Sequence, residues 1–308
     1  MQIHKHWAGI APAHRGASVA MGNFDGVHLG HQRVIALAAK AAAPLGIVTF
    51  EPHPREFFAP AAPPFRLMNA EARTHRLEKL GVVELYELPF DTRLAGMEAE
   101  AFVAEVLVEG LGISHVTVGA DFRFGKGRKG STDTLRREGA RFGFGVTVAD
   151  LVAADGAEIS STAIRLALSE GRPRDAARML GHWHRIEGPV LDGDRRGREL
   201  GYPTANMALN GLHLPKPGIY AVKVDVLTGP HAGTYDGAAS LGIRPMFELP
   251  HPTLETHLFD FTGQLYGEHL SVALVDYLRP EMTFDGLAAL VAQMDADCAR
   301  AREILAAL

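Results

Sequence analysis

The stretch that decides the fold is Ser18 to His31, which reads SVAMGNFDGVHLGH. Its first residues form a short, largely apolar run that ends at glycine, as a buried strand does. Gly22, Gly26 and Gly30 then allow a sharp turn and a close approach of ligand, because glycine has no Cβ. The alanine-rich run that follows favours a helix. This order predicts an anion site, since the first N–H groups of a helix are unpaired.

Two histidines follow the glycine turn, three residues apart. A helix that begins near Gly30 places the imidazoles of His28 and His31 at its N-terminus, within reach of one bound phosphate. Imidazole donors at this place stabilise charge that develops on an α-phosphate under attack. An HxxH pair alone is more often incidental, but the glycines, the strand, the helix and Asp25 together indicate a phosphate-transfer site.

Length and composition indicate a globular protein of two domains. The chain has 308 residues, of which 47% are hydrophobic and 22% charged, with a net charge of -5. No apolar run approaches the roughly 20 residues that cross a bilayer, and the net charge does not favour a nucleic-acid partner. The single cysteine, Cys298, forms no internal disulfide, and the first residues lack a secretory signal. We therefore expect a cytoplasmic protein without a membrane or nucleic-acid partner.

Residues 1–182 are predicted to form a Rossmann-like α/β domain, because strand-like and helix-like runs alternate along them. The predicted strands cover residues 18–21, 46–50, 82–88, 115–119 and 145–151, and the predicted helices cover 70–80, 98–111 and 132–142. Ligands of parallel sheets bind beyond the carboxyl ends of the strands. The motifs described next are expected at these ends.

The second predicted strand ends in EPHPR, residues 51–55. Its two prolines predict a rigid extended loop. From such a loop His53 and Arg55 approach an anionic or aromatic substrate, or they stand as exposed charges on a purely structural segment. The residues alone leave both interpretations open.

The fourth predicted strand leads into GADFRFGKGRKGS, residues 119–131. Its glycines and four basic side chains predict a mobile cationic loop that folds over phosphates. Phe122 and Phe124 either offer an aromatic face to a ring or anchor the loop in the core. Further along, ISSTAIR predicts a helix start in which Ser160 or Ser161 is the cap, with Arg165 one turn on to meet a phosphate.

Residues 183–308 are predicted to form a small antiparallel β-barrel that ends in a helix from residue 284. In PTAN, an extended chain puts Thr204 and Asn206 on one face, where their oxygens suit Mg²⁺, although such spacing alone more often indicates a capping turn. In ETHLFDF, Glu255 shares a face with His257 and Phe259. A carboxylate that points into the barrel there acts as a general base, while a surface glutamate is the alternative.

Several of these strings resemble one known family. GNFDGVHLGH, residues 22–31, looks like the nucleotidylyltransferase signature of bacterial bifunctional riboflavin kinase/FAD synthetases. The GADFRFG, ISSTAIR, GRELGYPTAN and ETHLFDF strings are similar to further motifs of that family, in the same order and over nearly the whole chain. The resemblance implies a bifunctional transferase that uses ATP and Mg²⁺. By this resemblance, the C-terminal domain is expected to phosphorylate riboflavin to FMN. The N-terminal domain is expected to adenylylate FMN to FAD, with release of pyrophosphate.

The resemblance also implies roles for individual residues. In the adenylylation site it assigns catalysis to His28, His31 and Arg165, and ATP and phosphate binding to Gly22, Phe24, Asp25, Gly30, Gly119, Asp121, Phe124, Ser160, Ser161 and Thr162. It assigns flavin contacts to His53, Pro54, Arg55 and Arg279. In the kinase site it implies Glu255 as the base, Thr204 and Asn206 as Mg²⁺ ligands, and phosphate contacts from Gly193, Arg198 and Gly201.

One segment departs from the family pattern. SLGIRPMF places Ser240 and Met246 where NxGxxPTF has Asn and Thr. This departure leaves open a chain that retains one activity only. Two alternatives of other classes also stay open: a non-catalytic flavin- or nucleotide-binding regulatory protein, and a cytidylyltransferase. The expected partners are riboflavin, FMN and ATP, and a weak homo-oligomer is left open.

Overall fold

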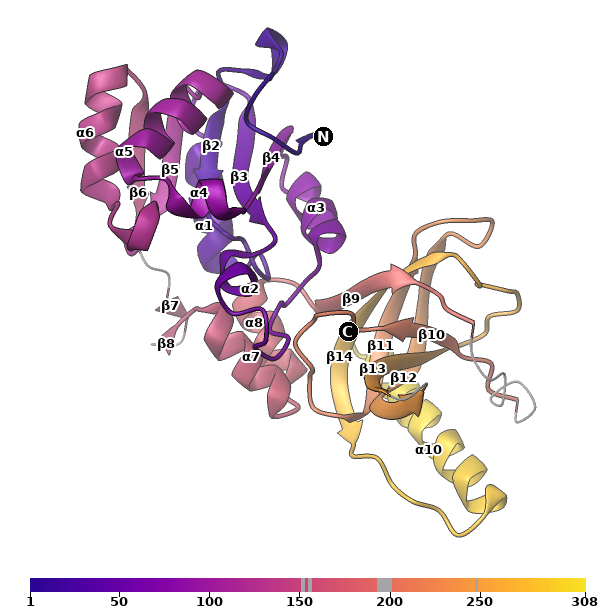
Figure 1. Cartoon of the computed structure of the whole chain (residues 1–308). Coiled ribbons are helices and arrows are strands. Elements are labelled where there is room, and N and C mark those ends of the chain that lie inside the picture. The colour runs from indigo at the N-terminus through magenta and orange to yellow at the C-terminus, as the bar shows by residue number, and fades with distance from the viewer. Residues whose placement is uncertain (151–152, 155–156, 193–200, 247–248) are drawn as a thin grey trace. The chain divides into compact units, whose positions relative to one another are not determined.

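The computed structural model describes residues 1–150, 153–154, 157–192, 201–246 and 249–308. These residues divide into two compact units, which are described one after the other (Figure 1). Unit 1 consists of Met1–Pro63 and Arg73–Ile159, and unit 2 consists of Pro64–Ala72 and Ser160–Leu308.

Unit 1 is built on a six-stranded parallel sheet with the order β1-β4-β3-β2-β5-β6. The strands are β1 (Gln2–His4), β2 (Ser18–Met21), β3 (Leu45–Glu51), β4 (Glu84–Pro89), β5 (His115–Gly119) and β6 (Gly145–Ala149). The predicted Rossmann-like sheet is confirmed, with one strand more than the five predicted. The additional strand is β1, whose three residues are too few to show a period-two pattern.

Helices connect these strands. They are α1 (Leu29–Ala38), α2 (Pro54–Phe58), α3 (Ala70–Lys79), α4 (Thr92–Gly96), α5 (Ala99–Ala101), η2 (Phe102–Leu111) and α6 (Thr132–Phe142). Short 3-10 turns, η1 (Pro12–His14) and η3 (Lys126–Arg128), and a hairpin of β7 (Ala153–Ala154) with β8 (Ala157–Glu158) complete the unit. The predicted helices over residues 70–80 and 132–142 are confirmed.

The predicted helix over residues 98–111 takes a different form. Most of it is a π-helix, η2, in which the N–H of Gly112 donates to the carbonyl of Leu107, five residues earlier. Apolar periodicity indicates that a helix forms, but it does not distinguish the hydrogen-bond register of a π-helix from that of an α-helix.

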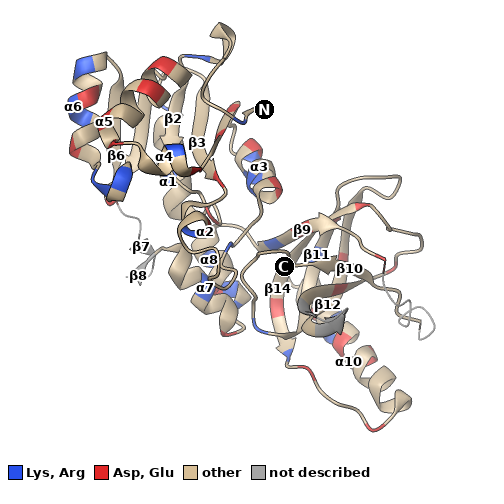
Figure 2. Cartoon of the chain, viewed as in Figure 1, with Lys and Arg blue, Asp and Glu red and all other residues tan. Residues whose placement is uncertain are grey.

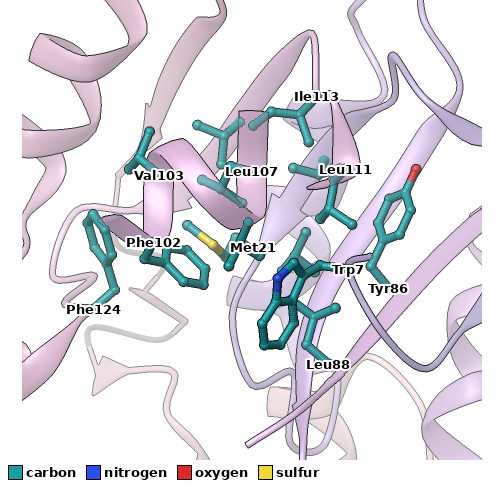
Figure 3. Packing of buried hydrophobic residues seen from close by; sticks show 14 of the residues in the cluster. Trp7, Met21, Tyr86, Leu88, Phe102, Val103, Leu107, Leu111, Ile113 and Phe124 are labelled. Atoms are coloured by element: carbon teal, nitrogen blue, oxygen red, sulfur yellow. The ribbon is translucent and has the colours of Figure 1, made fainter. Parts of the chain in front are cut away.

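The core of unit 1 is one continuous apolar cluster around the sheet (Figure 3). It includes large side chains that are at most 4% exposed, among them Trp7, Met21, Tyr86, Phe102 and Leu107. Met21 is the last residue of β2, so this packing holds the end of the strand from which the glycine turn leaves.

Unit 2 contains a six-stranded antiparallel sheet with the order β10-β13-β12-β11-β14-β9. The strands are β9 (His184–Pro189), β10 (Ala205–Ala208), β11 (Gly218–Val226), β12 (Gly233–Met246), β13 (Leu249–Leu258) and β14 (His269–Arg279). The N–H of Leu191 donates to the carbonyl of Asn206 at 2.8 Å, so the chain leaving β9 meets β10 and the sheet nearly closes. The predicted antiparallel barrel is confirmed.

In the described part of unit 2, three helices accompany the sheet. The last, α10 (Leu287–Ala306), packs Ala301, Ile304 and Leu305 against Phe259 and Val275 of the barrel strands and the turn after β13, which confirms the predicted C-terminal helix. The other two, α7 (Ser161–Ser169) and α8 (Pro173–Leu180), form a separate cluster with the segment of residues 64–72.

Charged residues of both signs lie together on the helices. Figure 2 shows Lys or Arg beside Asp or Glu on α3 and α6. On α6, Arg136 pairs with Asp133 at 2.9 Å and Arg137 pairs with Glu100 at 2.7 Å. Among the described residues, no helix is long and apolar enough to cross a membrane.

His184 makes the stability of unit 2 depend on pH. Its side chain is buried, and burial lowers its pKa to about 3, with smaller contributions from His182 and His213. The unfolded chain therefore binds a proton more readily than the folded one below pH 6.5, so the stability contributed by neutral His184 is present above pH 6.5 and lost as the pH falls. At pH 4.5 this loss is about 2–3 kcal/mol.

We expect unit 2 to become less resistant to urea between pH 7 and pH 4.5, and the His184→Gln variant to lose less of its resistance. Fluorescence of Trp183, in a Trp7→Phe background, reports the unfolding of this unit. His231→Gln, at a histidine that is only partly buried, is the matched control and should behave like the parent chain. The same loss of stability in the His184→Gln variant would contradict the prediction.

Candidate functional site

The first candidate site lies at the carboxyl edge of the parallel sheet in unit 1. Because β2, β3 and β5 are neighbours and run in the same direction, the segments that follow them leave at the same edge. These segments are residues 22–28, 52–58 and 119–131, which hold three of the four motifs predicted for this site. The fourth, residues 160–165, belongs to unit 2 and is described with it.

The turn after β2 has an unusual backbone. Phe24 at φ 52° and Val27 at φ 42° occupy the left-handed region, which side chains other than glycine rarely adopt. Both side chains are at most 1% exposed, so packing holds them in this conformation. The hydroxyl of Thr49 on β3 donates to the carbonyl of Asn23 at 3.2 Å and fixes the turn from the other side. Strained backbone that is held by its surroundings is typical of functional sites.

The helix α1 begins directly behind this turn. His28 is its N-cap, and the Nδ1 atom of His28 accepts a hydrogen bond from the N–H of His31 at 3.3 Å. The two imidazole rings stack, with centroids 3.7 Å apart and planes inclined by 17°. Gly30 makes room for this pair, since a Cβ at that position would lie 3.1 Å from ring atoms of His28. Both imidazoles therefore stand at the helix N-terminus.

The surroundings of the His31 imidazole suit an anionic ligand. Its Nδ1 atom is buried and has no hydrogen-bond partner among the described residues. Burial, and after it the neighbouring His28, holds the pKa of His31 well below its ordinary value, so the free imidazole is neutral. A phosphate oxygen at this place accepts from the ring and favours its charged form. The ring of Phe24 lies 5.2 Å from that of His31 and shields one side of it.

The loop after β5 is anchored in the core. Phe124 is 7% exposed, and it exchanges backbone hydrogen bonds of 3.2 and 2.9 Å with Gly130. Of the two interpretations of Phe124, the structure therefore shows the anchor. Between these residues, η3 forms a compact turn that displays exposed basic side chains, and Asp121 stands close to Gly119, with its Oδ1 3.2 Å from the position of a Cβ there.

The prediction of an extended loop over residues 51–55 is wrong. After β3 the chain forms α2, with His53 as the N-cap, whose Nδ1 accepts from the N–H of Arg55 at 3.1 Å. The N–H of His53 donates in turn to Glu56 at 3.0 Å, which completes a capping box. Pro54 fits the first helical position as well as it fits a loop, so prolines alone did not decide between the two.

An aromatic group beside this segment was not predicted. The rings of Phe57, Phe58 and Phe90 contact one another edge to face at 5.2 to 5.7 Å. Phe58 is 68% exposed, and an exposed aromatic surface next to a phosphate-binding turn is a suitable platform for a planar ring. The two adjacent phenylalanines at the end of EPHPREFF, residues 51–58, were the available signal.

In unit 2, the predicted cap and arginine of the ISSTAIR segment have clear partners. The Oγ of Ser160 accepts from the N–H of Ala163 at 3.2 Å, so Ser160 is the N-cap of α7. Ser161 and Thr162 form the first turn. The Nε of Arg165 donates to the carbonyl of Phe65 at 2.6 Å, and its guanidinium lies 5.3 Å from the Phe65 ring centre. The segment before α3 thus orients this guanidinium.

The second candidate site is a cavity of about 250 Å³ in unit 2. It is lined by residues at the start of β10 and by the turn after β13, residues 261–266. Thr204 and Asn206 both line it, and both are half-buried, while Ala205 and Met207 between and beyond them are buried. A hydroxyl and an amide oxygen are hard donors, so this donor set fits Mg²⁺.

Glu255 lies directly opposite Asn206 of β10 and Ser240 of β12 in the strand register. All three are half-buried, whereas Leu254 and Leu258 of β13 belong to the interior cluster of the barrel. Glu255 therefore does not point into the barrel, because the alternate positions of its strand already fill the interior. It shares a face with the candidate Mg²⁺ ligand Asn206.

The other predicted residues of this module have different surroundings. Arg279 is paired with Asp297 of α10 through contacts of 2.7 and 3.0 Å, with side chains 15% and 10% exposed, so it anchors that helix. Gly201 adopts φ 85° just before PTAN. Gly193 and Arg198 lie outside the described residues. The side chain of Met246 is not described either.

Two family models match the chain. The FAD synthetase model matches residues 10–163, and the riboflavin kinase model matches residues 180–305. A bifunctional riboflavin kinase/FMN adenylyltransferase of Pseudomonas fluorescens is 41% identical and covers 99% of this chain and 98% of its own length. The protein of the same name from Escherichia coli (strain K12) is 37% identical and covers 94% of this chain and 92% of its own.

A solved structure described as a macrolide-efflux protein from Streptococcus pneumoniae is also similar, at 32% identity, with a TM-score of 0.82 and coverage of 96% of each chain. Its name points to a different activity, and we take from it the fold alone. The family models and the relatives that match along nearly the whole chain agree with each other. The chain belongs to the bifunctional riboflavin kinase/FMN adenylyltransferase family.

Proposed function

We propose that this protein makes FAD from riboflavin in two steps at two sites. A C-terminal module, residues 183–308, transfers the γ-phosphoryl group of ATP to the 5′-hydroxyl of riboflavin. An N-terminal module, residues 1–182, then joins FMN to the adenylyl group of a second ATP. The observation that carries the proposal is the stacked pair of His28 and His31 at the N-terminus of α1, a phosphate site in the same chain as the oxygen-lined cavity of the barrel.

In the adenylylation step, an oxygen of the FMN phosphate attacks the α-phosphorus of ATP, and the bond to pyrophosphate breaks. His28, His31 and the first N–H groups of α1 donate to the phosphate oxygens on which charge develops. Gly22, Phe24 and Asp25 shape the turn, and Gly30 lets the phosphates approach closely. The loop with Gly119, Asp121 and Phe124, and the helix start with Ser160, Ser161, Thr162 and Arg165, bind the remaining parts of ATP.

Positioning supplies much of this acceleration, because the protein forms no covalent bond to the transferred group. His53, Pro54 and Arg55 stand beside the exposed ring of Phe58, where the flavin of FMN is expected to bind. Neutral His31 takes up a proton when the triphosphate arrives, since negative charge at the helix end favours the charged imidazole.

In the kinase step, Glu255 accepts the proton of the riboflavin hydroxyl as that oxygen attacks the γ-phosphorus. Thr204 and Asn206 would hold Mg²⁺, which neutralises charge on the phosphate oxygens when it is bound. Gly193, Arg198 and Gly201 contact the phosphates, and Arg279 contributes to the flavin end while it anchors α10. We further propose that the protein works in the cytoplasm on small molecules alone, which its single cysteine and net charge of -5 support.

The direct assay incubates pure protein with riboflavin, ATP and Mg²⁺ and separates the flavins by chromatography. We expect FMN to appear first and FAD to follow, with pyrophosphate released in proportion to FAD. With FMN supplied in place of riboflavin, replacement of ATP by CTP should abolish the formation of FAD. Tight flavin binding without consumption of ATP would favour a regulatory protein instead.

Replacement of His28 by asparagine separates its two roles. Asparagine is a good N-cap, so His28→Asn keeps α1 capped and removes only the imidazole. We expect kcat for FAD formation from FMN to fall about 100- to 1,000-fold, as the loss of one well-placed donor does, while FMN formation stays unchanged. Steady-state kinetics of both reactions on the same preparation measure this. A variant that keeps FAD formation within tenfold of the parent would show that the imidazole is not required.

Replacement of Glu255 by glutamine tests the other site. Glutamine keeps the size and polarity of the side chain but cannot accept the proton, so we expect FMN formation to fall about 100- to 10,000-fold. FAD formation from supplied FMN should stay at the parent rate. A matched control is Glu268→Gln, at the residue just before β14. The carboxylate of Glu268 accepts a hydrogen bond from the hydroxyl of Thr228, so this change should alter neither rate. Loss of both activities in a folded Glu255→Gln protein would contradict the two-site assignment.

A further inference from the structure

Two histidines meet around one carboxylate that lies far from them in the sequence of unit 1. Glu84, the first residue of β4, contacts His4 Nε2 at 2.7 Å and His14 Nδ1 at 2.9 Å. The two histidines end β1 and η1, and Glu84 follows them by 80 and 70 residues, so three elements converge here. The possible ligand atoms of the three residues all lie within 4.8 Å of one another.

The negative charge of Glu84 has no lysine or arginine at ion-pair distance in the described part of the chain. Glu84 is 8% exposed, and a buried carboxylate is costly without a compensating cation. Lys5 pairs with Glu87 instead. The guanidinium of Arg15 donates hydrogen bonds to the carbonyl groups of residues 108–110 at the end of η2. The charge is met only by two imidazoles, which lack the permanent charge of lysine or arginine.

The packing fixes these donors in place. In the parallel pairing of β1 with β4, Gln2 is opposite Glu84 and His4 is opposite Tyr86. The Tyr86 ring stacks on His4 at 5.1 Å and 20°, and its hydroxyl donates to the carbonyl of His14 at 2.6 Å. Figure 3 shows the Tyr86 ring at one side of the core cluster, with its hydroxyl directed away from the other labelled side chains. One buried ring thus positions both histidines.

We propose that His4, His14 and Glu84 bind one divalent transition-metal ion of the zinc class. Two imidazole nitrogens and one carboxylate oxygen are a common donor set for Zn²⁺, with bonds of about 2.0–2.2 Å and a fourth position for water. Mg²⁺ prefers an octahedral shell of oxygens and does not fit this set. The side chain of His14 is 36% exposed, which leaves a path to solvent for the ion and its water ligand.

Binding requires the three side chains to adjust, because their ligand atoms now lie within 4.8 Å of one another and not yet at the spacing of a metal shell. Each histidine takes the tautomer that turns a lone pair toward the ion, at Nε2 of His4 and at Nδ1 of His14, so the ion replaces the protons now shared with Glu84. Ligand atoms around a tetrahedral zinc ion are about 3.3 Å apart, so the imidazoles retreat from the carboxylate by about half an ångström.

The proposed metal site is separate from the adenylylation site. Glu84 is at the amino end of β4, whereas the phosphate-binding turn leaves the carboxyl end of β2. A rise of about 3.3 Å per residue puts the two edges of the sheet roughly 17 Å apart along the six residues of β4. The ion therefore does not touch the phosphates. It ties the N-terminal segment, residues 1–16, to the edge of the sheet.

The test uses the full chain, stripped of metal by a chelator and dialysed. Calorimetric titration with Zn²⁺ is carried out in excess Mg²⁺, which saturates oxygen-rich sites, and a parallel titration with Co²⁺ records the visible absorption of a four-coordinate ion. We expect one tight site in the parent chain. His14→Asn and Glu84→Gln should each weaken it at least 100-fold, because the loss of a mere supporting contact to a metal ligand already costs about 10- to 100-fold.

His6→Asn is the matched control, since His6 lies in the same segment, is exposed and accepts at Nδ1 from the N–H of Ala8 at 2.9 Å. Its Zn²⁺ affinity should stay within twofold of the parent. Zn²⁺ should also raise the thermal midpoint of unit 1 in the parent and in His6→Asn, but not in His14→Asn. Equal affinity in Glu84→Gln and the parent would overturn the proposal. So would an equal loss in His6→Asn, which would show loose chelation by the N-terminal histidines.

Discussion

The left-handed turn between β2 and α1 is the constraint on which the chemistry of unit 1 depends. Phe24 and Val27 adopt conformations that cost free energy, and they keep them because both side chains are buried in the core. The turn in this form brings α1 to the edge of the sheet with His28 as its cap and His31 stacked behind it. A relaxed turn would still connect the strand to a helix, but it would not aim two imidazoles and the helix N-terminus at one place.

In the barrel of unit 2, the alternation of side chains along each strand decides which residues reach the outer face. Leu254 and Leu258 fill the interior, so Glu255 is left on the other face, level with Asn206 and Ser240 of the neighbouring strands. The segment that departs from the family pattern therefore places its serine beside the proposed base. The outer face also carries α10, and the ion pair of Arg279 with Asp297 fixes that helix to β14.

The sequence predicted those features that local pattern controls, which include the strand before the glycine turn, the helix after it and the change from α/β to barrel. It did not predict β1, which is too short for a pattern, or α2, because proline suits a helix start and a loop equally. Alternation showed that Glu255 and His257 share a face but not which face is inward. The cluster of His4, His14 and Glu84 gave no signal, since Glu84 is 70 to 80 residues from the two histidines and meets them only in the folded chain.

The central claim is that one chain carries two separable sites linked by FMN. The most direct measurement mixes two variants, His28→Asn and Glu255→Gln, with riboflavin, ATP and Mg²⁺, and follows FAD. Each variant alone should form almost no FAD from riboflavin, whereas the mixture should form it at a rate that approaches the parent, because FMN made by one protein is used by the other. A mixture as inactive as the separate variants would contradict the claim.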